Sequence, residues 1–305
     1  MGAIDAFYEK ASIHSKQMHE PVTIVMLAHN GAAFTRHALE SILGASCLPA
    51  EMFLVDNCSE DGTPALIEEY APRFEEAGIR FQTWRNAANL GCSLARNEAW
   101  KKATQKYTVL MDNDAAVCTA DWLTRLRERL DSNQRLAILG PKIIYPFLPH
   151  KIQCAGVAIS RLGRIAFRGR GADRNAPQYQ DYWPAWALIS ACWMMRTDLR
   201  DTVGMLDELF HPVQYEDLDL CVRTRLAGWE VACDPTIEMY HFEGITTASF
   251  GQAEYSVNIA RNSLKFRQRY HALFKTLPEM LPAEDYRWLP RAELGLTPVL
   301  DLEYR

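Results

Sequence analysis

The stretch Tyr107-Thr108-Val109-Leu110-Met111-Asp112-Asn113-Asp114 joins a short apolar run to two carboxylates that are separated by one residue. Such a run, ending abruptly in polar residues, predicts a buried strand with a loop at its carboxyl end. Side chains two positions apart on an extended segment point the same way, so Asp112 and Asp114 can converge on one point. Mg²⁺ and Mn²⁺ prefer oxygen ligands of this kind. An acidic loop before the next helix is the alternative explanation.

Three more apolar runs precede this stretch, and a helical pattern follows each of them. The runs cover residues 22–28, 52–55 and 79–84, and polar residues follow them at Asn30, at Asp56-Asn57 and at Asn89. Regular alternation of strand and helix predicts a doubly wound, mostly parallel α/β sheet. Ligands bind such sheets at the carboxyl ends of the strands. Polar residues at all four ends therefore favour a ligand site over a simple acidic loop.

The second half of the chain has a different pattern. Short strands are predicted at residues 137–139, 143–145, 156–159 and 165–167, with a turn at 161–163 joining the last two. This predicts a smaller mixed or antiparallel region beside the parallel sheet. Trp183, Trp186 and Trp193 follow it. Aromatic side chains of this kind can pack in the core or form an apolar wall for a ligand.

An acidic helix and a late histidine complete the candidate residues. Leu218, Val222 and Leu226 repeat every four residues and Gly228 ends the pattern, which predicts a helix. Its first turn carries Glu216, Asp217 and Asp219. The helix dipole favours acidic residues there by ~0.3–1 kcal/mol each, but three carboxylates exceed what capping requires. His241 lies near the end of an alternating strand pattern, where it is either a core histidine or a ligand.

Composition limits the classes of partner. A net charge of −5 without a basic stripe gives no reason to expect a nucleic-acid partner. The 8 cysteines are scattered and have no zinc-site spacing, as in buried, reduced thiols of a cytoplasmic protein. No apolar run approaches the ~18 residues that span a bilayer. The basic helical pattern over residues 252–274 is interpreted as a solvated face or as a peripheral contact with the inner face of a membrane.

These motifs together resemble the family 2 glycosyltransferases, which use nucleotide sugars and have the GT-A fold. The resemblance covers residues 21–250 and rests on elements in order: Val22 to Asn30, Val55-Asp56-Asn57-Cys58-Ser59-Glu60-Asp61-Gly62, Asn89-Leu90-Gly91 with Ala95-Arg96-Asn97, Asp112-Asn113-Asp114, Glu216-Asp217-Leu218-Asp219-Leu220 and His241. It implies a nucleotide-binding half at 21–115 and an acceptor-binding half at 116–250, between an extension at 1–20 and a C-terminal helix and tail at 251–305. Ala28-His29-Asn30 departs from the Thr-x-Asn or Ser-x-Asn that relatives commonly carry, which leaves the contact of His29 open.

The resemblance also assigns roles to residues. It implies that Asp114, Asp112 and His241 hold Mn²⁺ or Mg²⁺ and that Trp193 contacts the acceptor. It also implies that Asp217 is the general base, with Glu216 either orienting the acceptor or substituting for Asp217. The nucleotide sugar would be bound by Ala28, His29, Asn30, Asp56, Asn57, Asn89, Gly91, Arg96, Asp112 and Asn113. Arg96 either supports the diphosphate or braces the aspartate loop. Donors linked to UDP, dTDP or GDP, and a glycan, glycolipid or small-molecule acceptor, are all compatible with these residues.

One candidate base and no second nucleophile predict a single displacement with inversion. The Q-x-x-R-W element and membrane helices of processive synthases are absent, which favours transfer of a single sugar. A nucleotidyltransferase is a rival class, but His29-Asn30-Gly31-Ala32-Ala33 lacks the Gly-rich, Arg- and Lys-bearing loop of those enzymes. A non-catalytic module that binds nucleotide sugars or a protein partner is the other rival.

Overall fold

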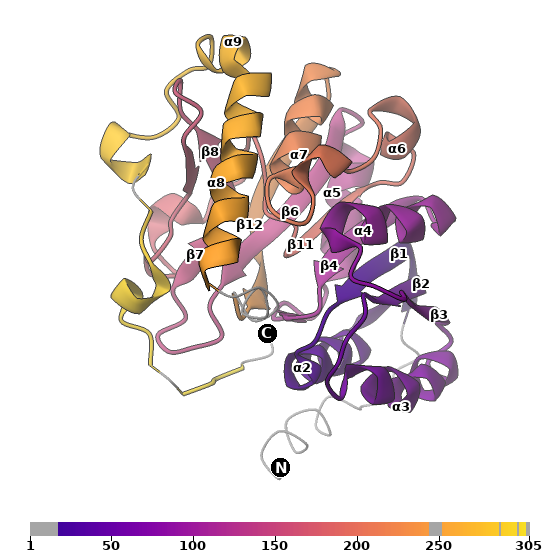
Figure 1. Ribbon diagram of the computed structural model, residues 1–305. Coiled ribbons are helices and arrows are strands. Elements are labelled where there is room, and N and C mark those ends of the chain that lie inside the picture. Colours follow the sequence, from indigo (N-terminus) through magenta and orange to yellow (C-terminus); the bar gives the residue numbers. More distant parts are fainter. Residues whose placement is uncertain (1–17, 244–251, 287, 298, 303–305) are drawn as a thin grey trace.

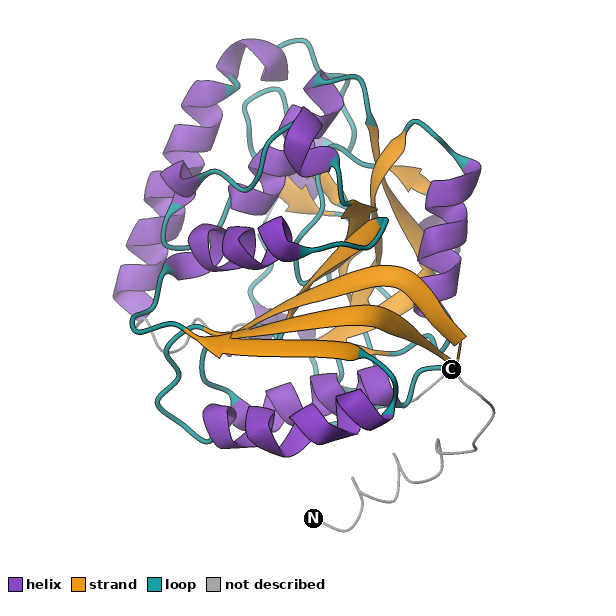
Figure 2. Ribbon diagram, turned by 90° about the vertical axis from the view of Figure 1, so that its right-hand side faces the viewer, coloured by secondary structure: helices purple, strands orange, loops and turns teal. Residues whose placement is uncertain are grey.

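A computed structural model describes residues 18–243, 252–286, 288–297 and 299–302. One large mixed sheet runs through the molecule, with the strand order β10-β12-β6-β11-β4-β1-β2-β3, and helices cover both of its faces (Figures 1 and 2). The predicted N-terminal extension at 1–20 lies outside the described residues as far as residue 17. Residues 18–20 already belong to the first strand, where they pair with residues 47–49.

The N-terminal half alternates strands and helices as the sequence predicts. Its elements are β1 (Met18–Ala28), α2 (Ala32–Leu43), β2 (Cys47–Asp56), α3 (Thr63–Glu76), β3 (Arg80–Arg85), α4 (Gly91–Lys102) and β4 (Tyr107–Asp112). All four strands are parallel, and α2 and α3 lie on one face of them with α4 on the other (Figure 1). Leu27 pairs with Asp112 and Ala28 pairs with Asp56, so the polar strand ends meet at one edge.

The C-terminal half extends the same sheet with mixed pairing. Its elements up to the last strand are β5 (Ala115–Val117), α5 (Trp122–Ser132), β6 (Leu136–Ile144), β7 (Ile152–Cys154), β8 (Val157–Ile159), β9 (Ile165–Phe167), η1 (Pro177–Tyr179), β10 (Trp183–Pro184), β11 (Cys192–Arg196), α6 (Leu199–Thr202), η2 (Glu208–Phe210), α7 (Glu216–Leu226) and β12 (Glu230–His241). Strand β11 is antiparallel to both β4 and β6 and thereby joins the two halves. The predicted hairpin with its turn at 161–163 is confirmed as β8 and β9. The α/β class, with a mixed region beside the parallel strands, is confirmed as well.

One strand differs from its prediction. Residues 136–144 form the single strand β6, although the sequence predicts two strands interrupted at Gly140-Pro141. Proline cannot donate to a ladder and usually ends a central strand. Here the register of β12 shifts between Asp234 and Glu238, opposite Pro141 and Lys142. The missing donor therefore falls at an irregularity of the ladder, and the strand continues through it.

The chain ends in a helix and a tail. Helix α8 (Gln252–Arg269) is followed by α9 (His271–Phe274), η4 (Ala283–Tyr286) and η5 (Arg291–Leu294). The tail, yellow in Figure 1, then returns beside the C-terminal half and away from β1–β3. Its end is tied down, because the Thr297 amide donates to the Leu148 carbonyl and the Asp301 amide donates to the Pro146 carbonyl. Within the described ranges, no helix is long and apolar enough to cross a membrane.

Candidate active site

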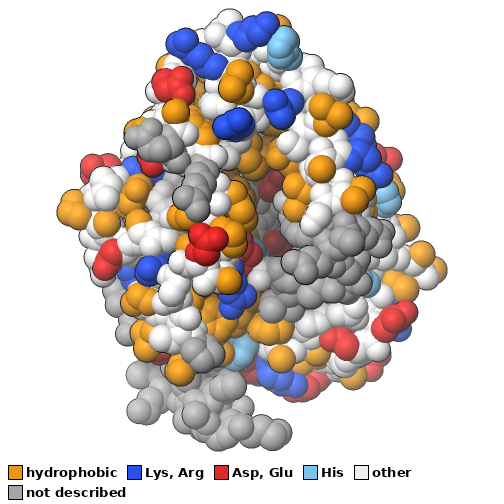
Figure 3. Space-filling model, turned by 60° about the vertical axis from the view of Figure 1, so that its left-hand side comes forward, with side chains coloured by type: hydrophobic (Ala, Val, Ile, Leu, Met, Phe, Trp, Pro, Cys, Tyr) orange, Lys and Arg blue, Asp and Glu red, His pale blue; other side chains and the backbone are white. Residues whose placement is uncertain are grey.

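A cleft of about 930 Å³ opens along the sheet edge where the parallel strands end. Figure 3 shows this hollow, with hydrophobic side chains on its walls and acidic groups in its depth. Both halves of the molecule contribute to it. Of the residues implicated from the sequence, the following line the cleft: His29, Asn57, Asn89, Gly91, Arg96, Asp112, Asn113, Asp114, Glu216, Asp217 and His241.

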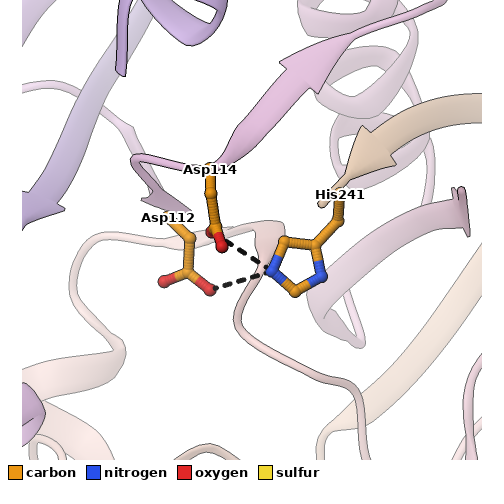
Figure 4. Close-up of side chains that lie close together, drawn as sticks. All are labelled: Asp112, Asp114 and His241. Carbon is orange, nitrogen blue, oxygen red and sulfur yellow. Dashed lines mark ion pairs between the residues drawn. The ribbon is translucent and has the colours of Figure 1, made fainter. Parts of the chain in front are cut away.

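Three potential metal ligands meet at the centre of the cleft. Asp112 ends β4, Asp114 follows it, and His241 ends β12, where it pairs with Ala115 of β5. The His241 Nε2 atom lies 3.2 Å from Asp114 Oδ1 and 3.8 Å from Asp112 Oδ2, so both carboxylates face the same ring nitrogen (Figure 4). One ligand atom from each of the three residues lies within 4.8 Å of the others. The pattern Asp-x-Asp alone could not predict that distance to His241.

The surroundings of this cluster suit a divalent cation. His241 Nδ1 lies 2.8 Å from Gln153 Oε1, so the ring can donate there and keep a lone pair on Nε2 for a metal. Burial lowers the pKa of His241, but the charge and hydrogen bond of Asp114, together with the charges of Asp112 and Glu243, outweigh burial and raise this pKa to about 9. Burial raises the pKa of Asp112 against the attraction of Arg96. A cation between these groups would relieve the repulsion of two carboxylates, and two oxygens with one imidazole nitrogen are a suitable ligand set for Mn²⁺.

Arg96 connects this cluster to the acidic helix. Its buried guanidinium forms an ion pair with Asp112 and donates to Ser190 Oγ at 2.7 Å. The Ser190 amide in turn donates to Asp217 Oδ2 at 3.1 Å. The metal-type carboxylate and the candidate base are therefore joined through two intervening residues. Of the two roles left open for Arg96, bracing the aspartate loop is the one that these contacts support.

The two carboxylates at the start of α7 have different surroundings. Asp217 also accepts from the Leu218 amide at 2.8 Å, whereas the Oε2 atom of buried Glu216 has no hydrogen-bond partner in the described part of the chain. Burial raises the pKa of Glu216 to about 8, helped by the charge of Asp217, and it raises the pKa of Asp217 to about 6. Near neutral pH, Glu216 therefore holds a proton while Asp217 is mostly ionised.

The turn that presents these carboxylates is strained and is held from α8. Gln214 and Tyr215 both have φ of 78°, which is unfavourable for residues with a side chain. The Nδ2 atom of fully buried Asn262 lies 2.7, 3.0 and 3.2 Å from the carbonyl oxygens of Phe210, Val213 and Gln214. Asn262 thus fixes the backbone immediately before Glu216. This role could not be predicted from the sequence, because an asparagine inside a helix is ordinary.

The loops after β2 and β3 form an amide network at one end of the cleft. Asn57 donates to Asn89 Oδ1 at 2.8 Å and accepts from Asn86 and from the Leu90 amide. Gly91 begins α4 with φ of 71°, and a Cβ there would lie 2.7 Å from the Pro212 carbonyl oxygen. Glycine is therefore required where the loop 211–215 crosses this helix. His29 Nδ1 lies 3.0 Å from the Asn57 carbonyl oxygen, which places the histidine of the atypical first loop in the same network.

Other predicted ligands lie behind the cleft wall. Ala28 is fully buried, and its carbonyl accepts from the Asn57 amide. Asp56 forms an ion pair with Arg85 at 3.2 Å and accepts from the Ser59 amide. Asn30 receives a hydrogen bond from Asn113, which also lines the cleft. These residues shape the loops, and their direct contact with a ligand stays a prediction.

The prediction for Trp193 is wrong. This tryptophan is fully buried in β11, pairs with Leu110 of β4, and does not line the cleft. The resemblance indicated its position along the chain but not the face of the strand on which it lies. Another tryptophan, Trp288 of the tail, lines the cleft instead.

Most basic residues of α8 form hydrogen bonds or ion pairs with other parts of the protein. Arg261 donates to the His211 carbonyl, Lys265 donates to the Leu209 carbonyl, and Arg269 pairs with Asp207 and Asp219. A membrane-binding face needs free cationic side chains. Three of the four basic residues of α8 instead have partners elsewhere in the protein. These side chains bind the loop 207–214 and hold it in place. Their contacts therefore favour neither a membrane-binding face nor a face that is only solvated.

Comparison with known proteins gives the same overall picture. The sequence profile described as Glycosyl transferase family 2 matches residues 23–204. The uncharacterized protein y4gI of Sinorhizobium fredii (strain NBRC 101917 / NGR234) is 29% identical over 231 residues, which are 73% of this chain and 24% of that protein. This chain therefore spans about a quarter of the length of that relative.

Two solved structures share the fold. GalNAc-T7, crystallised with UDP, GalNAc and Mn²⁺, matches with a TM-score of 0.59 and 16% identity over 72% of this chain and 42% of that chain. The mannosyltransferase PcManGT from Pyrobaculum calidifontis, in complex with GDP-Man and Mn²⁺, matches with a TM-score of 0.55 and 15% identity over 89% of this chain and 83% of that chain. At these identities the similarity establishes the GT-A fold.

Proposed function

Because this chain belongs to glycosyltransferase family 2, we propose that it moves a single sugar from a nucleotide-diphosphate sugar to an acceptor hydroxyl, with inversion and with a divalent metal. The observation that carries the proposal is the continuous contact from Asp112 through Arg96 and Ser190 to Asp217 in one cleft. It supports the proposal because the three potential metal ligands and the candidate base line the same cleft. Family membership also sets aside the nucleotidyltransferase alternative.

The residues divide into two groups with different tasks. Asp114, Asp112 and His241 would hold the metal, which when bound offsets the negative charge that develops on the departing diphosphate. Asn57 and Asn89 lie where the nucleotide of a GT-A protein would enter, at the carboxyl ends of β2 and β3. Asp217 would take the proton of the acceptor hydroxyl as its oxygen attacks the anomeric carbon. Protonated Glu216 can donate a hydrogen bond to a sugar hydroxyl, which an ionised carboxylate cannot do.

The proposal is tested by incubating the purified chain with UDP-, GDP- and dTDP-linked hexoses, with and without Mn²⁺. We expect slow release of free nucleotide from at least one donor, dependent on Mn²⁺ or Mg²⁺, because water can take the place of the acceptor hydroxyl as the attacking group. Stabilisation of the fold by a nucleotide sugar, without any release, would instead support a non-catalytic binding module. Product configuration, read by NMR once an acceptor is found, tests inversion.

The pH dependence of turnover should show an acidic limb. Asp217 acts as a base only when ionised, and burial raises its pKa to about 6. Turnover should therefore fall by about tenfold per pH unit below pH 6 and level off above it. The measurement is the rate of nucleotide release from pH 4.5 to 8 at saturating Mn²⁺. A rate that stays constant down to pH 4.5 would contradict the assignment of the base.

Replacing Asn262 by Ala should lower kcat by about 10- to 100-fold. Without Asn262 the turn before Glu216 can shift, and a displacement of the catalytic carboxylates by about 1 Å is enough for a loss of that size. The KM for the donor should change much less, since the bonds that the Asn262 amide donates go to the backbone before Glu216, and Asn262 itself does not line the cleft. Gln268→Ala, which removes an exposed amide from the same helix, is the control. Equal losses in kcat for both variants, or a loss confined to donor KM, would contradict a positioning role.

A further inference from the structure

The wall of the cleft farthest from the β2 and β3 loops is built partly by the C-terminal tail. Trp288, Pro290 and Arg291 line the cleft there, together with Phe167 of β9 and Arg170 just beyond it. The tail lies outside residues 23–204, the part of the chain that the family profile matches. Figure 1 shows the tail along the C-terminal half, on the side opposite β1–β3. If this wall binds a ligand, we therefore expect it to contact a part of the ligand other than the nucleotide.

Trp288 is held firmly although it is exposed. The Arg170 guanidinium lies 4.0 Å from the centre of the indole, and the Phe167 ring meets it edge-on at 5.2 Å. Arg170 is itself fixed by two contacts with Glu243 at 3.0 and 3.2 Å and by a hydrogen bond to the Leu289 carbonyl at 2.8 Å. Even so, 51% of the Trp288 surface is accessible. An immobilised, exposed tryptophan in a cleft is typical of a binding surface.

The tail just after Trp288 is also anchored. Arg291 donates to the carbonyl of Phe242 at 2.9 Å, and Phe242 follows His241, one of the three potential metal ligands. Leu294 packs so closely on Gly171 that a Cβ there would lie 2.9 Å from Leu294 Cδ2. A site placed on a fixed backbone loses little conformational entropy when a ligand binds. The wall is therefore organised before any ligand arrives.

We propose that Trp288, supported by Phe167 and Arg170, is the platform on which a pyranose ring of the acceptor stacks. This inference rests on the proposed function and names the substrate class on its acceptor side. The C–H face of a pyranose is apolar and slightly positive, and it complements the negative face of an indole. Glu243 balances the charge of Arg170, so the platform suits a neutral hexopyranose. Asp217, the proposed base, lines the same cleft.

The test is saturation-transfer NMR on the full chain with the methyl glycosides of glucose, galactose, mannose and N-acetylglucosamine as probes. At least one glycoside should receive saturation at its ring C–H protons. Trp288→Ala should weaken its binding by roughly tenfold or more, whereas Trp288→Phe should retain most of it. Trp186→Ala is the matched control, because Trp186 also stacks with an arginine, Arg225 at 4.5 Å, but does not line the cleft.

The outcomes separate this inference from the proposed function. Equal glycoside binding by wild type and a folded Trp288→Ala variant, judged by the same thermal unfolding midpoint, would overturn the platform. The absence of saturation transfer from wild type to every probe would overturn it as well. Glycoside binding that depends on Trp288, in a chain that never releases nucleotide from any donor, would support the platform and count against transferase activity alone.

Discussion

Replacement of Asp217 by Asn should lower turnover by about 10²- to 10⁴-fold while leaving donor affinity nearly unchanged. The amide keeps the size of the side chain, but its single oxygen can accept from only one of the Ser190 and Leu218 amides, which donate to different oxygens of Asp217. It cannot take a proton from the acceptor. The measurement is kcat for nucleotide release or sugar transfer, together with the dissociation constant of the nucleotide sugar.

A matched control for this variant is Glu208→Gln, which neutralises an exposed carboxylate in η2 that does not line the cleft. Its kcat should remain within about twofold of wild type, since surface substitutions rarely perturb the fold. If Asp217→Asn and Glu208→Gln gave the same rate, Asp217 would have no part in the chemistry. A loss of donor affinity that accounted for the whole effect would indicate a binding role instead.

Replacement of Asp114 by Ala should remove most metal-dependent turnover, by about 10²- to 10³-fold, because charge stabilisation by a metal is worth several kcal/mol. The same variant should lose the rise in thermal unfolding temperature that Mn²⁺ gives wild type, since a ligand stabilises only the state that binds it. This second readout does not depend on activity. It reports directly on the cluster of Asp114, Asp112 and His241.

Asp121→Asn is the control for the metal site, because Asp121 is an exposed carboxylate a few residues farther along the chain and outside the cleft. It should keep both the Mn²⁺-dependent turnover and the Mn²⁺-dependent stabilisation. If Mn²⁺ stabilised Asp114→Ala as much as wild type, the metal would have to bind at a site that does not include Asp114. The proposed roles of Asp112 and His241 would then also fail.

The N-terminal half could be predicted well from the sequence because its signals are local. Each of β1, β2, β3 and β4 is a short apolar run that ends in polar residues, and parallel strands place such ends at one edge whatever the details of packing. The pairing of Leu27 with Asp112 and of Ala28 with Asp56 follows from that rule. The same locality explains why the acidic first turn of α7 was recognisable.

The residues that were missed depend on contacts between distant segments. Trp193 and Trp288 are the same residue type, and only the tertiary packing decides that the first is buried in β11 and the second faces the cleft. Asn262 acts on a turn that lies about fifty residues earlier in the chain. Arg261 and Arg269 likewise bind His211 and Asp219, which lie about fifty residues earlier in the chain. The basic pattern of the helix alone could not predict these internal contacts.

The most direct test is a crystal structure of the Asp217→Asn variant with Mn²⁺ and the nucleotide sugar that wild type turns over. We expect Mn²⁺ bound by Asp114 and His241, the nucleotide beside Asn57 and Asn89, and the anomeric carbon facing residue 217 across space for one acceptor hydroxyl. A nucleotide sugar whose anomeric carbon faces away from residue 217, or a metal bound without Asp114, would contradict this expectation.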